Sequence, residues 1–154
     1  MTKYNNNYEY ELREKKGRDI MLGKLQHNDH IIAWEWMEID CHYDLLYSGV
    51  SHYYVVELKY RDKYASTATT ITHKGIMMEY IKYKALLEKA QDGYIPVYIM
   101  FFNDGVGYVY TLDDTPLEWR KINLPRKTAE DLGNIEKVVT YIPIEKCKRI
   151  TFEV

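Results

Sequence analysis

The feature that most constrains this chain is a pair of charged residues inside a short apolar stretch, residues 55–60, which reads VVELKY. The β-branched and aromatic residues favour a strand, and two adjacent valines indicate that both faces of the strand are covered. Because strand side chains alternate between faces, Glu57 and Lys59 share one face. A buried charge is costly unless it is paired, so these residues need each other, a metal ion or a solvated cleft.

A second carboxylate lies just upstream. Residues 42–47 (HYDLLY) are typical of the other arm of a hairpin whose turn is residues 48–52, and this hairpin would bring Asp44 toward Glu57. Mg²⁺ takes oxygen ligands and is commonly held by one or two carboxylates with water and phosphate. We therefore expect Asp44, Glu57 and the Leu58 backbone carbonyl to hold one or two Mg²⁺, with Mn²⁺ as the alternative ion.

These residue types suit the hydrolysis of a phosphodiester bond. That reaction needs a water made nucleophilic near the metal and positive charge to offset the charge that builds in the transition state. Lys59, on the same face as Glu57, can orient the water or offset that charge. The sequence thus predicts a metal-dependent phosphodiester hydrolase, an endonuclease by expectation, with Asp44, Glu57 and Lys59 as catalytic residues.

An Asp followed by twelve residues and then Glu-x-Lys resembles the PD-(D/E)xK nuclease superfamily, which has the restriction-endonuclease-like fold. Tyr43 stands where the motif has proline, a departure that many members of that superfamily also show. The resemblance implies an α-β-β-β-α-β core with Asp44 on the second strand and Glu57 and Lys59 on the third. It also implies cleavage of nucleic acid, for which we expect DNA.

The order of the predicted elements fits that core, so we expect an α/β fold whose mixed sheet is flanked by helices. Apolar periodicity and turn residues mark the elements. They are a helix over 8–26, strands over 31–38, 42–47 and 55–60, a helix over 73–91, a strand over 95–102 and an added strand over 106–112.

We expect one domain over residues 1–154, with a nuclease-like core over about 8–112 and a β-rich extension over 113–154. The polar start at residues 5–7 is expected to be disordered. The extension is predicted to hold a packed loop over 113–127, a loop or short helix over 128–136, a strand over 137–142, a helical turn over 143–148 and a last strand over 150–154.

Four residues could support the site. In many members of the superfamily an acid from the first helix joins the site, and the sequence leaves Glu14 and Asp19 open as alternatives. Asp40 could add a third carboxylate to the metal, although we expect it in the turn before the strand. His42 has the same side-chain parity as Asp44 and could line the cleft or carry a proton.

Basic residues near the site are candidates for nucleic-acid contact, although the net charge of −2 argues neither for nor against such a partner. Arg61 and Lys63 follow the Glu-x-Lys stretch, and Lys74 lies at the start of the expected second helix. Lys82 on that helix is our candidate for an auxiliary phosphate contact, with Lys84 as the alternative. Together such residues could follow a phosphate backbone.

The remaining composition bounds the setting. No apolar run is long enough to span a membrane, and the start lacks a signal-peptide pattern, so we expect a soluble, cytoplasmic protein. Cys41 and Cys147 have no metal-binding spacing and are expected to be reduced. Abundant Asn, Lys, Ile and Tyr are typical of an AT-rich bacterial or phage genome. A homodimer is possible, since enzymes that cut both strands often pair two sites.

Two other functions remain open. One is a catalytically inactive member of the same fold that binds nucleic acid or a protein partner. The other is a structural or regulatory protein in which Glu57 and Lys59 pair with neighbours. Carboxyl groups of Asp44 and Glu57 within about 4 Å of each other in a cleft would favour a metal site. A separation near 10 Å, or a face buried under a helix, would favour the structural alternative.

Overall fold

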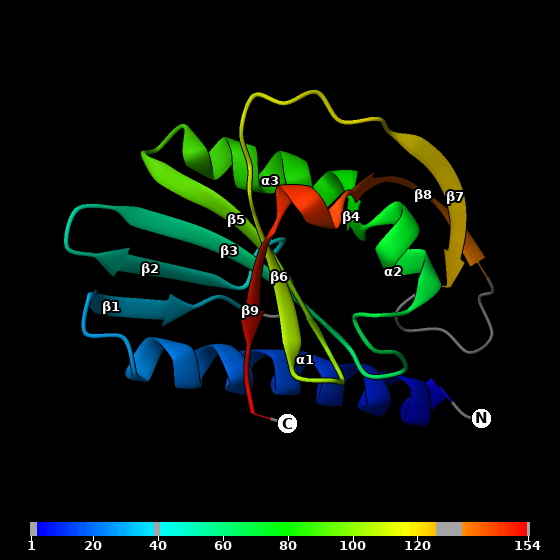
Figure 1. The fold of residues 1–154 in the computed structure, drawn as a ribbon, viewed down its shortest axis with the longest axis horizontal. Coiled ribbons are helices and arrows are strands. Elements are labelled where there is room, and N and C mark those ends of the chain that lie inside the picture. Colours follow the sequence, from blue (N-terminus) through cyan, green and yellow to red (C-terminus); the bar gives the residue numbers. More distant parts are fainter. Residues whose placement is uncertain (1–2, 39–40, 126–133, 154) are drawn as a thin grey trace.

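The computed structural model of the protein describes residues 3–38, 41–125 and 134–153. Its architecture is α/β: a mixed sheet of six strands has helices packed on it, and a smaller sheet of three strands lies beside it (Figure 1). In the described part of the chain, none of the helices combines the length and the apolar character that a membrane crossing needs.

The first half of the chain forms a long helix followed by three antiparallel strands. Alternating side chains in the third strand, with β-branched residues at its centre, suit a sheet that is covered on both faces. The elements are α1 (Lys3–Gln26), β1 (Ile31–Trp36), β2 (Leu45–Gly49) and β3 (Tyr53–Arg61), and β2 pairs with both β1 and β3.

The next segment completes the main sheet. A helical connection leads from β3 to a parallel neighbour, as a parallel pair requires. The elements are α2 (Thr69–Lys74), β4 (Ile76–Glu79), α3 (Tyr80–Ala90), β5 (Tyr94–Phe102) and β6 (Val106–Thr111). The order of strands in this sheet is β1-β2-β3-β5-β6-β9, with β5–β6 and β6–β9 antiparallel.

The second sheet combines β4 with strands from far along the chain. It has the order β4-β8-β7, with both pairs antiparallel. Its later strands are β7 (Arg120–Pro125) and β8 (Asn134–Ile142), and a 3₁₀ turn (Ile144–Lys146) then leads to β9 (Lys148–Thr151).

The two faces of β3 contribute to different apolar clusters. Val56 and Leu58 pack with Met21 and Leu25 of α1. Val55 belongs to the cluster that contains Leu86 of α3 together with side chains of β5. Because side chains alternate along the strand, the face that carries Val55 also carries Glu57, and it lies under α3.

The helix expected over residues 73–91 is wrong in its first part. Gly75 ends α2 with a φ of 101°, a conformation that favours glycine, and a Cβ there would meet the Ile142 carbonyl. The residues that follow form β4 by pairing with β8, and helix α3 starts only at Tyr80. Long-range pairing thus overrides the helical periodicity of the local sequence.

The prediction for the C-terminal segment is also corrected. Residues 120–125, expected to be loop, form β7, and the last strand pairs with β6 of the main sheet. The strand expected over 137–142 exists and begins earlier, at Asn134; residues 126–133 lie outside the described part of the chain. Residues 5–7, expected to be disordered, belong to α1.

Candidate metal-binding site

The Asp44 side chain accepts a hydrogen bond from a backbone N–H of β3 at the point where the pairing of β2 with β3 ends. Pairing of β2 with β3 begins at Leu45 and Val56, and the Asp44 backbone N–H still donates to the Val56 carbonyl at 2.8 Å. One step further along β3, the Leu58 N–H donates to Asp44 Oδ2, also at 2.8 Å. The carboxylate is therefore fixed at the point where the two strands stop pairing.

Glu57 lies beside Asp44. The exposed fraction of Glu57 is 2% and that of Asp44 is 7%. Hydrogen bonding between the two carboxyls is among the causes that lower the pKa of Asp44 and raise that of Glu57, so the structure brings the two predicted ligands within hydrogen-bond reach of each other.

Two lysines approach one oxygen of the Glu57 carboxyl, Oε2. Lys59 Nζ is 3.8 Å from Glu57 Oε2, and Lys82 Nζ is 3.4 Å from the same atom. Lys59 comes from β3, two residues after Glu57, whereas Lys82 points down from α3 and is almost fully buried. The structure thus brings together Asp44, Glu57, Lys59 and Lys82, four residues that the sequence singled out.

Arg18 is the member of this cluster that the sequence analysis missed. Its Nη2 donates to Asp44 Oδ1 at 3.2 Å and to the Met37 carbonyl at 3.0 Å. Arg18 follows Glu14 by four residues in α1, and this spacing places both side chains on one face of the helix. This spacing is the signal in the sequence that places Arg18 beside Glu14, but the resemblance implies an acid on this helix and no base.

The surroundings of the pair lower the pKa of Asp44 and raise the pKa of Glu57. Burial would raise the pKa of Asp44, but hydrogen bonds from Glu57 and the Leu58 N–H, with the charges of Arg18 and Lys59, lower it below its usual value. Burial raises the pKa of Glu57 well above its usual value; Lys59 opposes this shift and the Asp44 charge adds to it. The pair therefore keeps a proton at pH values where a free glutamate would be ionised.

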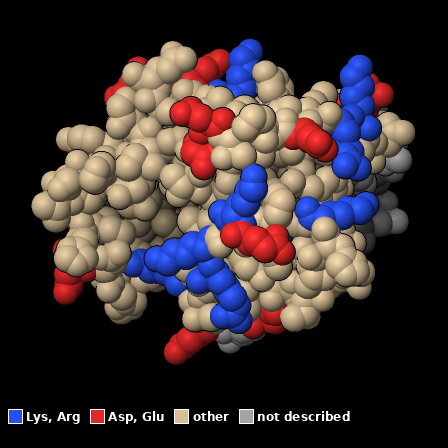
Figure 2. Space-filling view, turned by 45° about the horizontal axis from the view of Figure 1, so that its top comes forward, with Lys and Arg blue, Asp and Glu red and all other residues tan. Residues whose placement is uncertain are grey.

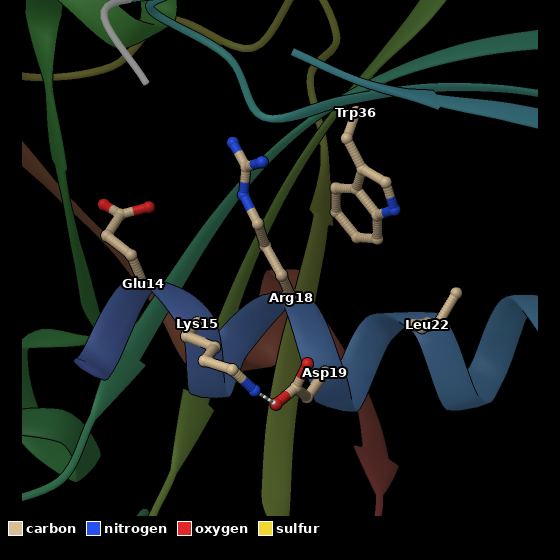
Figure 3. Close-up of a pocket in the computed structure, with 6 residues that line it drawn as sticks. All are labelled: Glu14, Lys15, Arg18, Asp19, Leu22 and Trp36. Carbon is tan, nitrogen blue, oxygen red and sulfur yellow. Dashed lines mark hydrogen bonds and ion pairs between the residues drawn. The ribbon is translucent and has the colours of Figure 1, made fainter. Parts of the chain in front are cut away.

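The two alternatives from the first helix are separated. Figure 3 shows Glu14 on the same side of α1 as Arg18, whereas Asp19 points away from that side and binds Lys15, with 2.7 Å between Lys15 Nζ and Asp19 Oδ2. The Asp19 side chain is more than half exposed. Glu14, rather than Asp19, is the acid of α1 that lies with Arg18.

Two other auxiliary candidates, His42 and Lys84, are exposed, in contrast to the buried pair. His42 is exposed in the bend before β2, so it lies outside the strand whose parity was used to place it. Lys84 is exposed on α3, whereas Lys82 is buried. Asp40 lies outside the described residues.

The basic residues do not form one continuous face. Arg61 is half-buried at the end of β3, and Lys63 is exposed in the following loop. Lys74 ends α2 and lies 5.6 Å from the ring of Tyr141 on β8. On the face drawn in Figure 2, lysine and arginine side chains gather in the lower and right parts of the view, with acidic side chains among them.

A pocket of about 390 Å³ adjoins the cluster on the α1 side. It is lined by residues of α1 and by the last residue of β1: Glu14, Lys15, Arg18, Asp19, Leu22 and Trp36. Arg18 belongs both to this pocket and to the carboxyl cluster, because its guanidinium contacts Asp44.

The donor set fits a hard cation held by few protein ligands. Among the described residues, no group of three or more His, Cys, Asp or Glu side chains is arranged to hold a metal. Two carboxylates in contact are enough for Mg²⁺, which keeps several waters. The Leu58 carbonyl can join them, because the N–H and C=O of one strand residue point to the same side and the Leu58 N–H already faces Asp44.

Comparison with known proteins gives no match: no family model fits the sequence, no curated protein is similar to it, and no solved structure is similar to this fold.

Proposed function

We propose that this protein is a Mg²⁺-dependent nuclease that hydrolyses phosphodiester bonds in nucleic acid, with DNA as the favoured substrate. The observation that carries the proposal is the direct contact of the Asp44 and Glu57 carboxyls at the end of the β2–β3 pairing, with Lys59 beside them. Two buried carboxyls in contact oppose each other's ionisation, and a divalent cation removes that opposition.

The order of elements supports a restriction-endonuclease-like core. Helix α1 is followed by three antiparallel strands, then by α3 and by β5, which is parallel to β3. Asp44 directly precedes the second strand, and Glu57 and Lys59 lie on the third. The resemblance to the PD-(D/E)xK superfamily implies this order of elements, with two differences: the strand expected over 42–47 begins only at Leu45, so that Asp44 is not part of it, and two further elements, α2 and β4, precede α3.

In the proposed reaction, Asp44, Glu57 and the Leu58 carbonyl hold Mg²⁺, and Mn²⁺ can replace it. The bound ion supplies Lewis acidity toward the scissile phosphate and lowers the pKa of water near it. Asp44 is prepared for this role because its lowered pKa keeps it ionised. Glu57 has to release its proton before it can bind the cation.

The cationic side chains act on the substrate. Lys59 orients the attacking water or offsets charge in the transition state, because it lies on the same face as Glu57. Lys82 balances the charge of Glu57 from α3 and is placed to contact a phosphate oxygen that enters this face. Arg18 holds Asp44 from the other side of the sheet.

The test is a cleavage assay with labelled single- and double-stranded DNA and RNA, in Mg²⁺ or Mn²⁺ against EDTA. We expect metal-dependent cleavage by the wild type and by the control Glu136→Gln, an exposed acid of β8 that pairs with Lys121. Asp44→Asn, Glu57→Gln and Lys59→Ala should lose activity. Wild-type rates from a protein that carries both carboxyl substitutions would refute the assignment.

The face that carries Glu57 is buried under α3, which favours the alternative of a structural or regulatory protein in which Glu57 and Lys59 pair with neighbours. This burial is also compatible with a catalytically inactive member of the fold that binds nucleic acid or a protein. Glu57 and Lys82 are 2% and 6% exposed under α3, and Lys59 and Arg18 add positive charge to the pair. Such a cluster can be a purely structural element. Salt-sensitive DNA binding without turnover in any divalent metal would favour the inactive member of the fold over the nuclease.

A further inference from the structure

The pocket beside the carboxyl pair is built to take a flat ring. Trp36 and Leu22 supply apolar surface, and Figure 3 shows the Trp36 ring on the sheet side of α1, next to Arg18, with Glu14 on the other side of Arg18. Lys15 and Asp19, both largely exposed, line the outer part. At about 390 Å³ the pocket is at the small end of the range for ligand sites, which suits one small planar group.

One side chain connects this pocket to the candidate metal site. The Arg18 guanidinium carbon lies 5.3 Å from the centre of the Trp36 ring, and its Nη2 lies 3.2 Å from Asp44 Oδ1. A group held against Trp36 is therefore separated from the carboxyl pair by a single guanidinium. Because the guanidinium already lies over the Trp36 ring, a planar ligand would meet Trp36 and Arg18 side by side along one wall of the pocket and not between them.

We propose that this pocket binds an unpaired nucleobase, adjacent to the phosphate held at Asp44 and Glu57, and that the substrate is single-stranded or carries a single-stranded segment. This inference rests on the proposed function, because it takes nucleic acid as the ligand. Bases stack on aromatic side chains in proteins that bind single strands, whereas the faces of a base within a duplex are covered by its neighbours.

The charges around the pocket favour the base over the phosphate as its occupant. The lining holds two acids, Glu14 and Asp19, and two cations, Lys15 and Arg18. Both cations are already paired, Lys15 with Asp19 and Arg18 with Asp44, so the pocket offers no surplus positive charge to a phosphate, whereas carboxylates accept hydrogen bonds from the exocyclic amines of a base. Lys59 and Lys82 lie at the carboxyl pair instead. The site therefore separates a base position from a phosphate position.

Tryptophan fluorescence in EDTA tests the inference without cleavage, since the chain has three tryptophans, Trp34, Trp36 and Trp119. The probes are a twelve-nucleotide single-stranded DNA and a hairpin duplex. In a Trp34→Phe, Trp119→Phe protein, the single strand should quench the remaining fluorescence and the duplex should not. In Trp36→Phe, this single-strand quenching should be absent.

Binding affinity gives a second measurement. Trp36→Leu should weaken single-strand binding by about 5- to 140-fold, the range expected for one base–aromatic stack, while Trp36→Phe retains most of it. Trp34→Leu is the matched control on the same strand and should bind like the wild type. Circular dichroism of all these proteins shows whether Trp36→Leu is folded. If it is not, the Trp36→Phe variant and the quenching measurement test the inference without it.

Equal affinity for the single strand in Trp36→Leu and in the wild type, or equal quenching of Trp36 by strand and hairpin, would overturn the inference. Its failure is distinguishable from failure of the proposed function. Binding that depends on Trp36 without cleavage in any metal leaves the base pocket intact and removes the nuclease. Metal-dependent duplex cleavage that is unchanged in Trp36→Leu removes the base pocket and leaves the nuclease.

Discussion

Two buried or nearly buried glutamates, one in each sheet, meet lysines in different ways. Glu79 of β4 forms an ion pair with Lys137 of β8, with 3.1 Å between Oε1 and Nζ. Glu57 of β3 has Lys59 and Lys82 nearby at longer distances, and it also touches a second carboxyl. A like-charged neighbour raises the cost of burying Glu57, and perturbed carboxyl pairs of this kind cluster at functional sites, so the Glu57 cluster is our candidate for function.

The largest expected difference between the two glutamates is in catalysis. Loss of a residue that only supports a metal ligand costs about 10–100-fold in activity. We expect Glu57→Gln and Asp44→Asn each to reduce metal-dependent cleavage by more than this, because each removes a proposed ligand. Glu79→Gln should cleave nucleic acid at nearly the wild-type rate. The measurement is kcat/KM on the best labelled substrate in Mg²⁺.

Stability has to be followed in the same proteins, since Glu57 and Glu79 both lie in packed strands. The free energy of urea unfolding shows whether a variant loses cleavage because it is unfolded or because it lacks the carboxylate. If Glu79→Gln and Glu57→Gln lose cleavage to the same extent while both remain folded, the contrast between the two sheets has no catalytic meaning.

The second contrast concerns metal binding to the folded protein. A cation that binds only the native state at a hundred times its Kd stabilises that state by about 2.7 kcal/mol. For a chain of this size that is a rise in Tm on the order of 5–10 °C. We expect Mg²⁺ or Mn²⁺ to raise the Tm of the wild type and of Glu79→Gln, and not that of Glu57→Gln.

This metal stabilisation should depend on pH. The raised pKa of Glu57 means that the cation must displace a proton, so metal affinity should increase as the pH rises toward the pKa of the pair. Tm titrations at several pH values measure the effect. Equal metal stabilisation of Glu57→Gln and the wild type would place the cation elsewhere.

Much of the main sheet could be predicted from the sequence because its signals are local. The valines of β3, the apolar run of β5 and the glycine turn at 103–105 mark the strands without knowledge of their partners. The second sheet could not be predicted in this way. Residues 76–79 carry a helical pattern, and they form β4 only because β8, more than fifty residues away, pairs with them.

The same division holds for the site. Asp44, Glu57 and Lys59 could be predicted because a hairpin and strand alternation place them together. Lys82 was expected near the site, but its burial against Glu57 depends on how α3 packs over β3. Arg18 was missed because its contact with Asp44 joins α1 to the residue before β2 across 26 residues, and its four-residue spacing from Glu14 does not show which strand that face of the helix contacts.

The third contrast is the pH dependence of stability without metal. The folded-state pKa of Glu57 is raised above its unfolded value, so the native state holds a proton that the unfolded chain releases. Stability from this group is therefore lost as the pH rises above the unfolded value toward the folded one. Glu57→Gln mimics the protonated group, so in EDTA its stability relative to the wild type should increase with pH.

Urea unfolding of both proteins at several pH values above 4.5 measures this difference. Asp44 acts in the opposite sense: its lowered pKa contributes stability at neutral pH that is lost in acid, below its unfolded value of 3.8. A constant stability difference between Glu57→Gln and the wild type would mean that Glu57 is ionised in the folded protein.

The smallest expected effects are on the free energy of unfolding, in two ion pairs of the second sheet that differ in burial. Lys137→Ala removes an ion-pair partner of Glu79, whose side chain is only 11% exposed, and should cost about 1 kcal/mol or somewhat more. Lys121→Ala breaks a pair whose side chains are 71% and 62% exposed, and should change the free energy of unfolding by less than about 0.5 kcal/mol. Equal losses in urea unfolding would mean that burial does not set the strength of these pairs. The raised pKa of Glu57 is attributed to burial in the same way, so equal losses would mean that the pH dependence of stability has a different cause.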